Sequence, residues 1–176
     1  MTTPEILHTL ESMVLLVDTR EQDTMRLRAR LEQAGIPHER CKLDFGDYSA
    51  KFISTDGKVY SLADRVVIER KMSLDELAQC FTHGRDRFTR EFERAKAVGG
   101  KIYLLVENGS FEAIEEAAYR SKMNPKALLA SVLAWEARYN SPVLFCKPKT
   151  SGKLIKEILY REGKQWLEGL ENAENQ

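Results

Sequence analysis

The 176-residue sequence has no long apolar segment and few cysteines. No run of about 18 apolar residues occurs, so the chain lacks a segment that could cross a membrane as a helix. Its three cysteines, Cys41, Cys80 and Cys146, lie far apart, and no two of them form a CxxC pair. This spacing supports neither a disulfide framework nor a zinc knuckle.

Neither sign of charge is in excess, because 27 Lys and Arg residues balance 27 Asp and Glu residues. Nucleic-acid binding therefore cannot be inferred from net charge and has to be argued from local charge. The N-terminal sequence MTTPEILHTLES has neither the basic start nor the apolar run of a signal peptide. We expect an intracellular protein: cytoplasmic if it is bacterial or phage-encoded, nuclear if it is eukaryotic.

The sequence does contain short apolar runs that alternate with helical patterns over its whole length. Four runs predict buried strands: Met13–Val17, Arg65–Ile68, Ile102–Val106 and Pro142–Cys146. The stretch between residues 38 and 62 predicts shorter strands with a hairpin turn at Asp56-Gly57. Helices are predicted between Asp23 and Gly35, from Ser73 to Phe81, from Arg85 to Ala97, after Ser110, from Pro125 to Arg138, and from Thr150 onward. This alternation predicts one α/β domain with its core at about residues 13–160.

Three carboxylates lie at the ends of predicted strands or in the turn between them: Asp18, Asp47 and Glu69. Lys71 follows Glu69 by two residues, and the alternation along a strand places both side chains on one side. Hard divalent cations such as Mg²⁺ prefer carboxylate oxygens. A metal held there can activate water, while a nearby ammonium stabilises developing negative charge. The pattern is typical of metal-dependent nucleases of the PD-(D/E)xK type.

Three segments extend this pattern, and they occur in a fixed order: Val17-Asp-x-Arg-Glu21, Gly46-Asp47-Tyr48 and Val67-Ile-Glu-Arg-Lys-x-x-x-Asp75-Glu-Leu77. Together they closely resemble the nuclease domain of the XPF/MUS structure-specific endonuclease family, whose signature is GD…ERKxxxD. The resemblance is detailed from Met13 to Val106. It implies a central mixed β-sheet flanked by helices, in a restriction-endonuclease-like fold.

The same resemblance implies a ligand set for Mg²⁺ or Mn²⁺. Asp18, Asp47 and Glu69 would hold the ion, and the main-chain carbonyl of Arg70 would be a further ligand. Glu21 would lie beside it.

Other signature positions have implied roles as well. Lys71 would act on the attacking water or the phosphate. Arg20 and Arg70 resemble the motif arginines, which contact phosphate or fix the carboxylates by charge-assisted hydrogen bonds. Asp75 matches the last signature position, but it also lies in the first turn of a predicted helix, where the dipole favours a carboxylate. Its role stays open between these two interpretations.

DNA contacts are predicted from a locally basic stretch. Gly84-Arg85 resembles the Gly-Arg that follows the signature in this family, and Arg87 belongs to the same basic segment. An excess of positive charge is what backbone binding requires. The alternative is a solvated helix face with ion pairs such as Arg87–Glu91.

The sequence therefore predicts a Mg²⁺- or Mn²⁺-dependent DNA endonuclease acting on branched or single-stranded DNA, in repair, recombination or phage and bacterial DNA processing. One alternative is a catalytically silent scaffold that binds DNA or a partner, and another is a restriction-type or RNA-directed nuclease. We expect neither a tandem helix-hairpin-helix module nor a helicase. Relatives pair through their nuclease domains, which suggests a homodimer with Trp135 of the helix from Pro125 at the contact.

Overall fold

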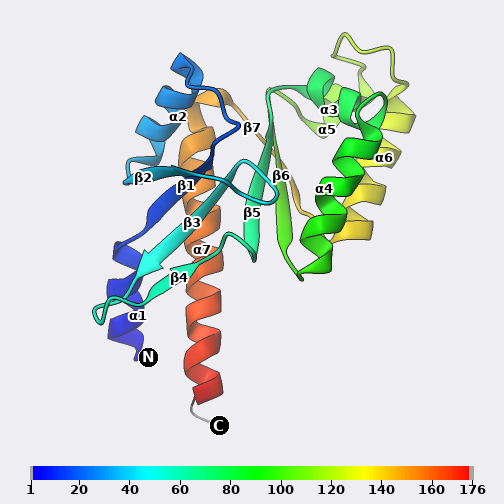
Figure 1. Ribbon diagram of the computed structural model, residues 1–176. Coiled ribbons are helices and arrows are strands. Elements are labelled where there is room, and N and C mark those ends of the chain that lie inside the picture. Colours follow the sequence, from blue (N-terminus) through cyan, green and yellow to red (C-terminus); the bar gives the residue numbers. More distant parts are fainter. Residues whose placement is uncertain (1, 175–176) are drawn as a thin grey trace.

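The computed structural model describes residues 2–174, which form one sheet with helices packed on both faces (Figure 1). The strands are β1 (Val14–Asp18), β2 (His38–Cys41), β3 (Tyr48–Ile53), β4 (Val59–Ser61), β5 (Val66–Lys71), β6 (Lys101–Glu107) and β7 (Val143–Cys146). Their order in the sheet is β2-β1-β3-β5-β6-β7, and β4 pairs with β3 as a hairpin. The Gly57 amide donates to the Ser54 carbonyl, which confirms the predicted turn.

The sheet is mixed, as expected. Strand β3 runs antiparallel to both β1 and β5, whereas β1–β2, β5–β6 and β6–β7 are parallel pairs. Tyr48, the first residue of β3, therefore pairs with Val17 in β1 and with Ile68 in β5. This topology brings the ends of β1 and β5 and the start of β3 together at what we call the carboxyl end. The opposite end, where β5 and β6 begin, is the amino end.

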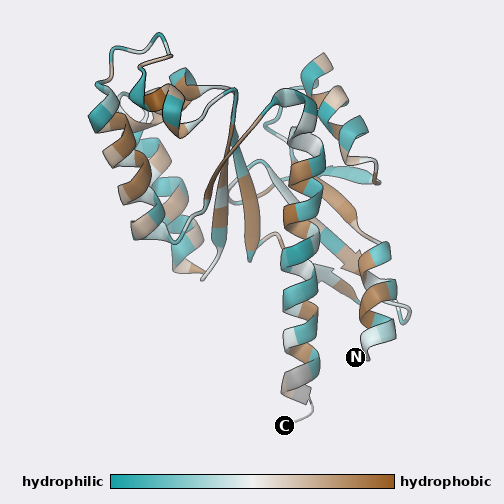
Figure 2. Cartoon of the chain, turned by 180° about the vertical axis from the view of Figure 1, so that it is seen from behind, coloured by the Kyte–Doolittle hydropathy of each residue, from teal (hydrophilic) through white to brown (hydrophobic). Residues whose placement is uncertain are grey.

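Among residues 2–174, seven helices form the two outer layers (Figure 1). One face of the sheet carries α1 (Thr3–Glu11), α2 (Met25–Ala34) and α7 (Pro148–Glu174). The other face carries α3 (Leu74–Phe81), α4 (Arg85–Ala97), α5 (Phe111–Glu115) and α6 (Pro125–Tyr139). Figure 2 shows hydrophobic strands between helices that mix apolar and polar residues. Within the described range, no helix is both long and apolar enough to cross a membrane.

Two separate cores follow from the strand alternation. In β5, Val66 and Ile68 pack under α1, α2 and α7, while Val67 packs under the other layer. The second core contains an aromatic cluster in which Trp135 stacks on Phe88 at 5.1 Å between ring centres. Trp135 is 2% exposed. Its predicted place in a dimer contact is therefore wrong, because its apolar surface is already covered within the chain.

Three local features differ from the expectations. Helix α1 was not predicted, although Thr2 and Glu5 form a capping box at its start. Helix α2 is capped by Thr24, whose hydroxyl accepts from the Leu27 amide, and not by Asp23, which pairs with Arg28. Strand β5 also continues through Lys71, so the charged signature residues belong to the sheet itself.

Candidate active site

A cavity of about 260 Å³ opens at the carboxyl end of the sheet. It lies between the end of β5, the Gly46-Asp47 turn and the helices α3 and α4. Most of its lining residues are charged: Arg20, Glu21, Asp47, Glu69, Arg70, Lys71, Glu76, Cys80, Gly84, Arg87, Phe88, Glu91 and Arg94. The structure thus brings together five of the six predicted catalytic residues, and Asp18 is the exception.

Alternation along β5 separates the three signature charges. Glu69 and Lys71 lie on the α3 and α4 side, where they pair with each other and the Lys71 ammonium sits 5.2 Å from the centre of the Phe88 ring. Arg70 points to the opposite face, toward Glu107. Burial alone would lower the pKa of Lys71, but the neighbouring Glu69 charge raises it above its ordinary value. Lys71 is therefore a fixed positive charge in the cavity wall.

Asp47 is held by the neighbouring strand. Its amide donates to the Ile68 carbonyl at 2.8 Å, and its Oδ2 accepts from the Arg70 amide at 2.8 Å. Burial, followed by the charges of Glu69 and Glu21, raises the pKa of Asp47 well above its ordinary value. Negative groups therefore converge on Asp47, and a cation would relieve their repulsion.

The glycine before Asp47 has a steric explanation. Gly46 has φ +71°, and a Cβ there would lie 2.5 Å from Cγ2 of Val67. Its amide donates to Oε1 of Glu91 in α4 at 2.9 Å. Glu91 therefore fixes the turn that presents Asp47. Sequence reasoning treated Glu91 only as a charge on a helix face, and no local pattern distinguishes it from the other acids of α4.

Asp18 does not line the cavity. It is fully buried, its Oδ1 accepts from the amide and Nε of Arg20, and its Oδ2 accepts from the Leu43 amide at 2.7 Å. Burial opposes ionisation, but the hydrogen bonds from Arg20 and Leu43 outweigh it and lower the pKa of Asp18. Arg20 in turn donates to the Gly46 carbonyl at 3.3 Å. Asp18 thus supports the turn through Arg20, and its assignment as a metal ligand stays a prediction.

The residues present fit a divalent cation at Asp47 and Glu69. Among residues 2–174, no cluster of three or more His, Cys, Asp or Glu side chains is close enough to hold a metal ion. Mg²⁺, however, is usually bound through one or two carboxylates, with water and substrate phosphate in its other positions. Asp47 and Glu69 supply two carboxylates beside a polar cavity.

The last signature residue, Asp75, lies outside this cavity. Its Oδ1 accepts from the amides of Arg120 and Ser121, both at 2.7 Å, and its Oδ2 lies 3.4 Å from Nε of Arg120. These bonds tie the chain between α5 and α6 to the start of α3. Asp75 is in the first turn of α3, as the second interpretation expected, and it also joins two segments.

Of the arginines predicted to contact DNA, Arg85 lies outside the cavity lining and the others line the cavity. Arg87 lines the cavity together with Arg94, which also donates to the Asp44 carbonyl at 3.2 Å. Arg85 is exposed outside the lining, with its Nη1 3.5 Å from the Phe81 carbonyl. The side chain of Arg20 is 59% exposed. It pairs with Asp18 and also lines the cavity.

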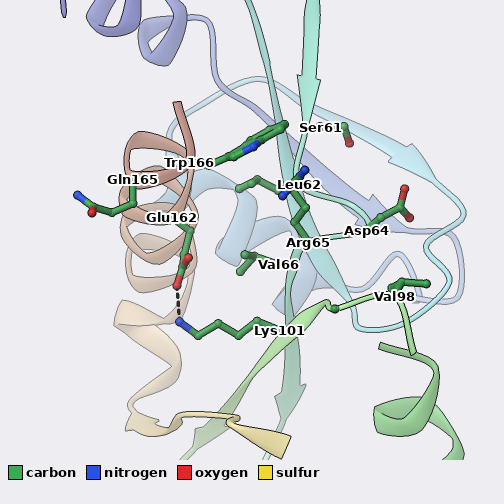
Figure 3. Close-up of a pocket in the computed structure, with 11 residues that line it drawn as sticks. Ser61, Leu62, Asp64, Arg65, Val66, Val98, Lys101, Glu162, Gln165 and Trp166 are labelled. Atoms are coloured by element: carbon green, nitrogen blue, oxygen red, sulfur yellow. Dashed lines mark hydrogen bonds and ion pairs between the residues drawn. The ribbon is translucent and has the colours of Figure 1, made fainter. Parts of the chain in front are cut away.

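A second cavity of about 600 Å³ lies at the amino end (Figure 3). Lys101 pairs with Glu162 there at 2.7 Å, and the Arg65 guanidinium lies 4.4 Å from the centre of the Trp166 ring. None of the predicted site residues lines it. The amino-end cavity is therefore not the site that the signature residues predict.

The family model of the ERCC4 domain matches residues 17–158, a range that includes every residue lining the carboxyl-end cavity. The chain belongs to the ERCC4 domain family. No curated protein matches this ERCC4 domain.

Solved structures resemble this ERCC4 domain in fold. XPF from Aeropyrum pernix has a TM-score of 0.60 and 20% sequence identity, and the match covers 82% of this chain and 64% of that chain. XPF from Aeropyrum pernix in complex with DNA has a TM-score of 0.61 and 21% identity, with 86% and 65% covered. The ERCC4 domain thus spans less than two thirds of either XPF chain. The likeness shows the α/β, restriction-endonuclease-like fold.

Proposed function

We propose that this ERCC4 domain is a metal-dependent DNA endonuclease that hydrolyses phosphodiester bonds. The observation that carries the proposal is the convergence of Asp47, Glu69 and Lys71 on one polar cavity at the end of the sheet. These three side chains come from two segments 22 residues apart in sequence and match the GD…ERK signature. Inactive relatives usually lose the signature charges, so their presence favours the enzyme over the silent scaffold.

Asp47 and Glu69 are the proposed side-chain ligands of Mg²⁺ or Mn²⁺, with the Arg70 carbonyl and Asp18 as further candidates. When bound, such an ion supplies positive charge that activates water and screens the phosphodiester. Glu21 lies at the same wall and adds to the negative field that attracts the ion.

The remaining residues bind and orient the substrate. Lys71, a fixed ammonium, stabilises negative charge on the phosphate as the water attacks. Arg87 and Arg94 of α4 and Arg20 all line the cavity, so they can contact the phosphates around the scissile bond. Arg85 would extend this contact along α4.

Branched or single-stranded DNA is the proposed substrate, in repair, recombination or phage and bacterial DNA processing. The choice rests on the resemblance of the signature to structure-specific endonucleases, and the DNA complex of the Aeropyrum XPF supports DNA as the polymer. A homodimer through the nuclease domain is proposed on the same family grounds, without Trp135 as a contact.

The test is cleavage of labelled single-stranded, duplex, flap and fork DNA, and of RNA of the same sequence, with Mg²⁺ or Mn²⁺. We expect metal-dependent cutting of DNA, lost in Asp47→Asn and lowered about 100- to 1,000-fold in Lys71→Ala. Lys101→Ala is the matched control, because Lys101 also pairs with a glutamate but at the amino end. Folded protein that binds DNA without cutting any substrate would favour the scaffold, and preferential cutting of RNA would change the substrate.

A further inference from the structure

Behind the cavity wall, on the face covered by α2 and α7, five side chains form a closed polar network. They come from five segments. Glu21, Tyr48 and Arg70 belong to the signature segments, whereas Arg30 and Glu107 lie outside them. We call this network the ring, and its members are Glu21, Arg30, Tyr48, Arg70 and Glu107. Glu21 and Arg70 also line the cavity, whereas the other three do not.

The contacts run around the ring without a break. The Tyr48 hydroxyl donates to Oε2 of Glu21 at 2.7 Å and accepts from Nη1 of Arg30 at 2.8 Å. Nη2 of Arg30 donates to Oε1 of Glu107 at 3.2 Å, and Oε2 of Glu107 accepts from Nη1 of Arg70 at 3.4 Å. Nη2 of Arg70 closes the ring, 3.9 Å from Oε2 of Glu21.

The ring is buried and its charges balance. The side chains of Arg30 and Glu107 are 5% and 3% exposed, and those of Arg70 and Glu21 are 16% and 18% exposed. Two cations face two carboxylates, so no net charge is buried. Burying such a set is nevertheless a poor way to gain stability, because desolvation offsets much of the attraction. A role beyond stability is therefore the better explanation.

The ring also contains a buried donor that has no partner, and this is unfavourable for stability. Nε of Arg70 is buried and has no hydrogen-bond partner among the described residues. An unpaired buried donor costs free energy, which a position selected for stability alone would avoid. The guanidinium of Arg70 is held instead by its Nη atoms, between Glu107 and Glu21.

Both cavity members of the ring act on Asp47. The main-chain amide of Arg70 donates to Oδ2 of Asp47, and the side chain of Glu21 lines the same cavity as Asp47. The position of either one therefore affects the geometry and field at the proposed metal ligand.

We propose that Arg30, Tyr48 and Glu107 are positioning residues that hold Glu21 and Arg70 against Asp47 and so tune the affinity of the site for its divalent cation. This inference rests on the proposed nuclease function. Tyr48 is central, because its hydroxyl connects Glu21 to Arg30. Removing a residue that hydrogen-bonds to a metal ligand commonly lowers metal affinity or activity by about 10- to 100-fold.

The test compares two tyrosines whose hydroxyls have the same kinds of partner, a glutamate and a cation. Tyr48→Phe removes only the hydroxyl from the ring. Tyr103→Phe is the control, because Tyr103 also lies on a strand, donates to a glutamate (Glu162) and adjoins a cation (Lys101), but at the amino end. Mn²⁺ affinity is measured by calorimetric titration without DNA, and kcat and KM are measured for cleavage at several Mn²⁺ concentrations.

We expect Tyr48→Phe to bind Mn²⁺ about 10- to 100-fold more weakly. Its kcat should fall at low Mn²⁺ and recover at high Mn²⁺, with KM for DNA unchanged, while Tyr103→Phe matches the wild type. Glu107→Gln, which keeps the shape of the side chain, is the second variant and should also bind Mn²⁺ more weakly than the wild type. All proteins are compared where circular dichroism shows them folded.

Two results would overturn the inference in distinguishable ways. A wild-type protein that neither binds Mn²⁺ nor cuts DNA overturns the proposed function and the role of the ring with it. If the wild type does both, an unchanged Mn²⁺ affinity in Tyr48→Phe and Glu107→Gln overturns the role of the ring alone. A loss of kcat that added Mn²⁺ does not restore has the same consequence, because it reports a purely structural effect.

Discussion

The two ends of the sheet use the same chemical groups in different surroundings. At the carboxyl end, Tyr48 donates to Glu21 beside Arg30, whose side chain is 5% exposed. At the amino end, Tyr103 donates to Glu162 beside Lys101, whose side chain is 33% exposed. The first cluster adjoins the candidate active site, and the second adjoins an open cavity without predicted site residues (Figure 3).

Burial explains why only the first cluster is expected to matter for function. Exposed ion pairs are screened by water and pay side-chain entropy, so they contribute little and constrain little. A buried network has few alternative partners, and each member is confined to one arrangement. The carboxyl end therefore holds its charges in fixed positions, at a cost in stability that the amino end does not bear.

The largest expected difference between the ends comes from removing one cation from each. Arg30→Ala leaves Glu107 buried without its main partner and should lower the free energy of unfolding by about 3–5 kcal/mol. Lys101→Ala should lower it by about 0–1 kcal/mol. Urea unfolding followed by circular dichroism measures both. Equal losses would show that the two ends do not differ in the way their burial predicts.

A second pair of changes compares two glycines with positive φ at opposite ends of β3. Gly57→Ala, at φ +83° with open space around it, should cost about 1–2 kcal/mol. Gly46→Ala adds a contact of 2.5 Å with Val67, so overpacking should add about 1–3 kcal/mol and displace Asp47. Thermal unfolding measures stability, and loss of cleavage is expected only for Gly46→Ala. A more stable Gly46→Ala variant would contradict the steric argument.

Asp47→Asn should raise the free energy of unfolding, whereas the changes above lower it, and the effect should be smaller. A carboxyl whose folded-state pKa is raised stabilises the protein fully below its ordinary pKa of about 3.9, and this contribution is lost as pH rises through the raised value. Asp47→Asn should therefore be more stable than the wild type at pH 7, by about 0.5–2 kcal/mol.

The dependence of the stability difference on pH and on metal tests whether repulsion at Asp47 is its cause. The advantage of Asp47→Asn should shrink as pH falls toward about 4, because Asp47 is then protonated in the folded protein and about half protonated in the unfolded protein. Added Mg²⁺ should stabilise the wild type and not the variant. Unfolding curves from pH 4 to 8, with and without Mg²⁺, give both results. A variant less stable than the wild type at pH 7 would show that Asp47 is not under repulsion.

The smallest effect is expected at the amino end. Arg65→Ala removes the contact between the guanidinium and the Trp166 ring, which should cost about 0.5–1 kcal/mol at this exposed site. Cleavage should stay at the wild-type rate, as measured on the preferred DNA substrate. A large loss of cleavage in Arg65→Ala would place function at the amino end and break the comparison.

Much of the fold was predictable because its signals are local. The apolar runs of β1, β5, β6 and β7 and the starts of α3 at Ser73, of α5 after Ser110 and of α6 at Pro125 are visible within a few residues of sequence, and the structure confirms them. Helix α1 has a comparable local signal in its Thr2 and Glu5 capping box. The placement of Glu69 and Lys71 on one side of β5 followed from strand alternation alone.

The support of the site was not predictable, because its residues are far apart in sequence. Arg30 and Glu91 lie on helices in which the other charged residues are exposed or only partly buried, and nothing nearby marks them as different. Arg30 is buried only because α2 packs closely on α7, where a Cβ on Gly152 would lie 2.0 Å from the Arg30 carbonyl oxygen. Asp18 was assigned to the metal by its motif, but its carboxylate is held by Arg20 and Leu43.

The sequence by itself determined the α/β alternation, the signature charges and the side of β5 on which Glu69 and Lys71 lie. Only the tertiary structure decided which charges are buried, that Arg30, Tyr48 and Glu107 stand behind Glu21 and Arg70, and that Asp18 does not line the cavity. The physical reason is the range of the forces involved. Strand alternation and helix capping act over a few residues, whereas burial and charge pairing depend on segments that only the packed sheet and helices bring together.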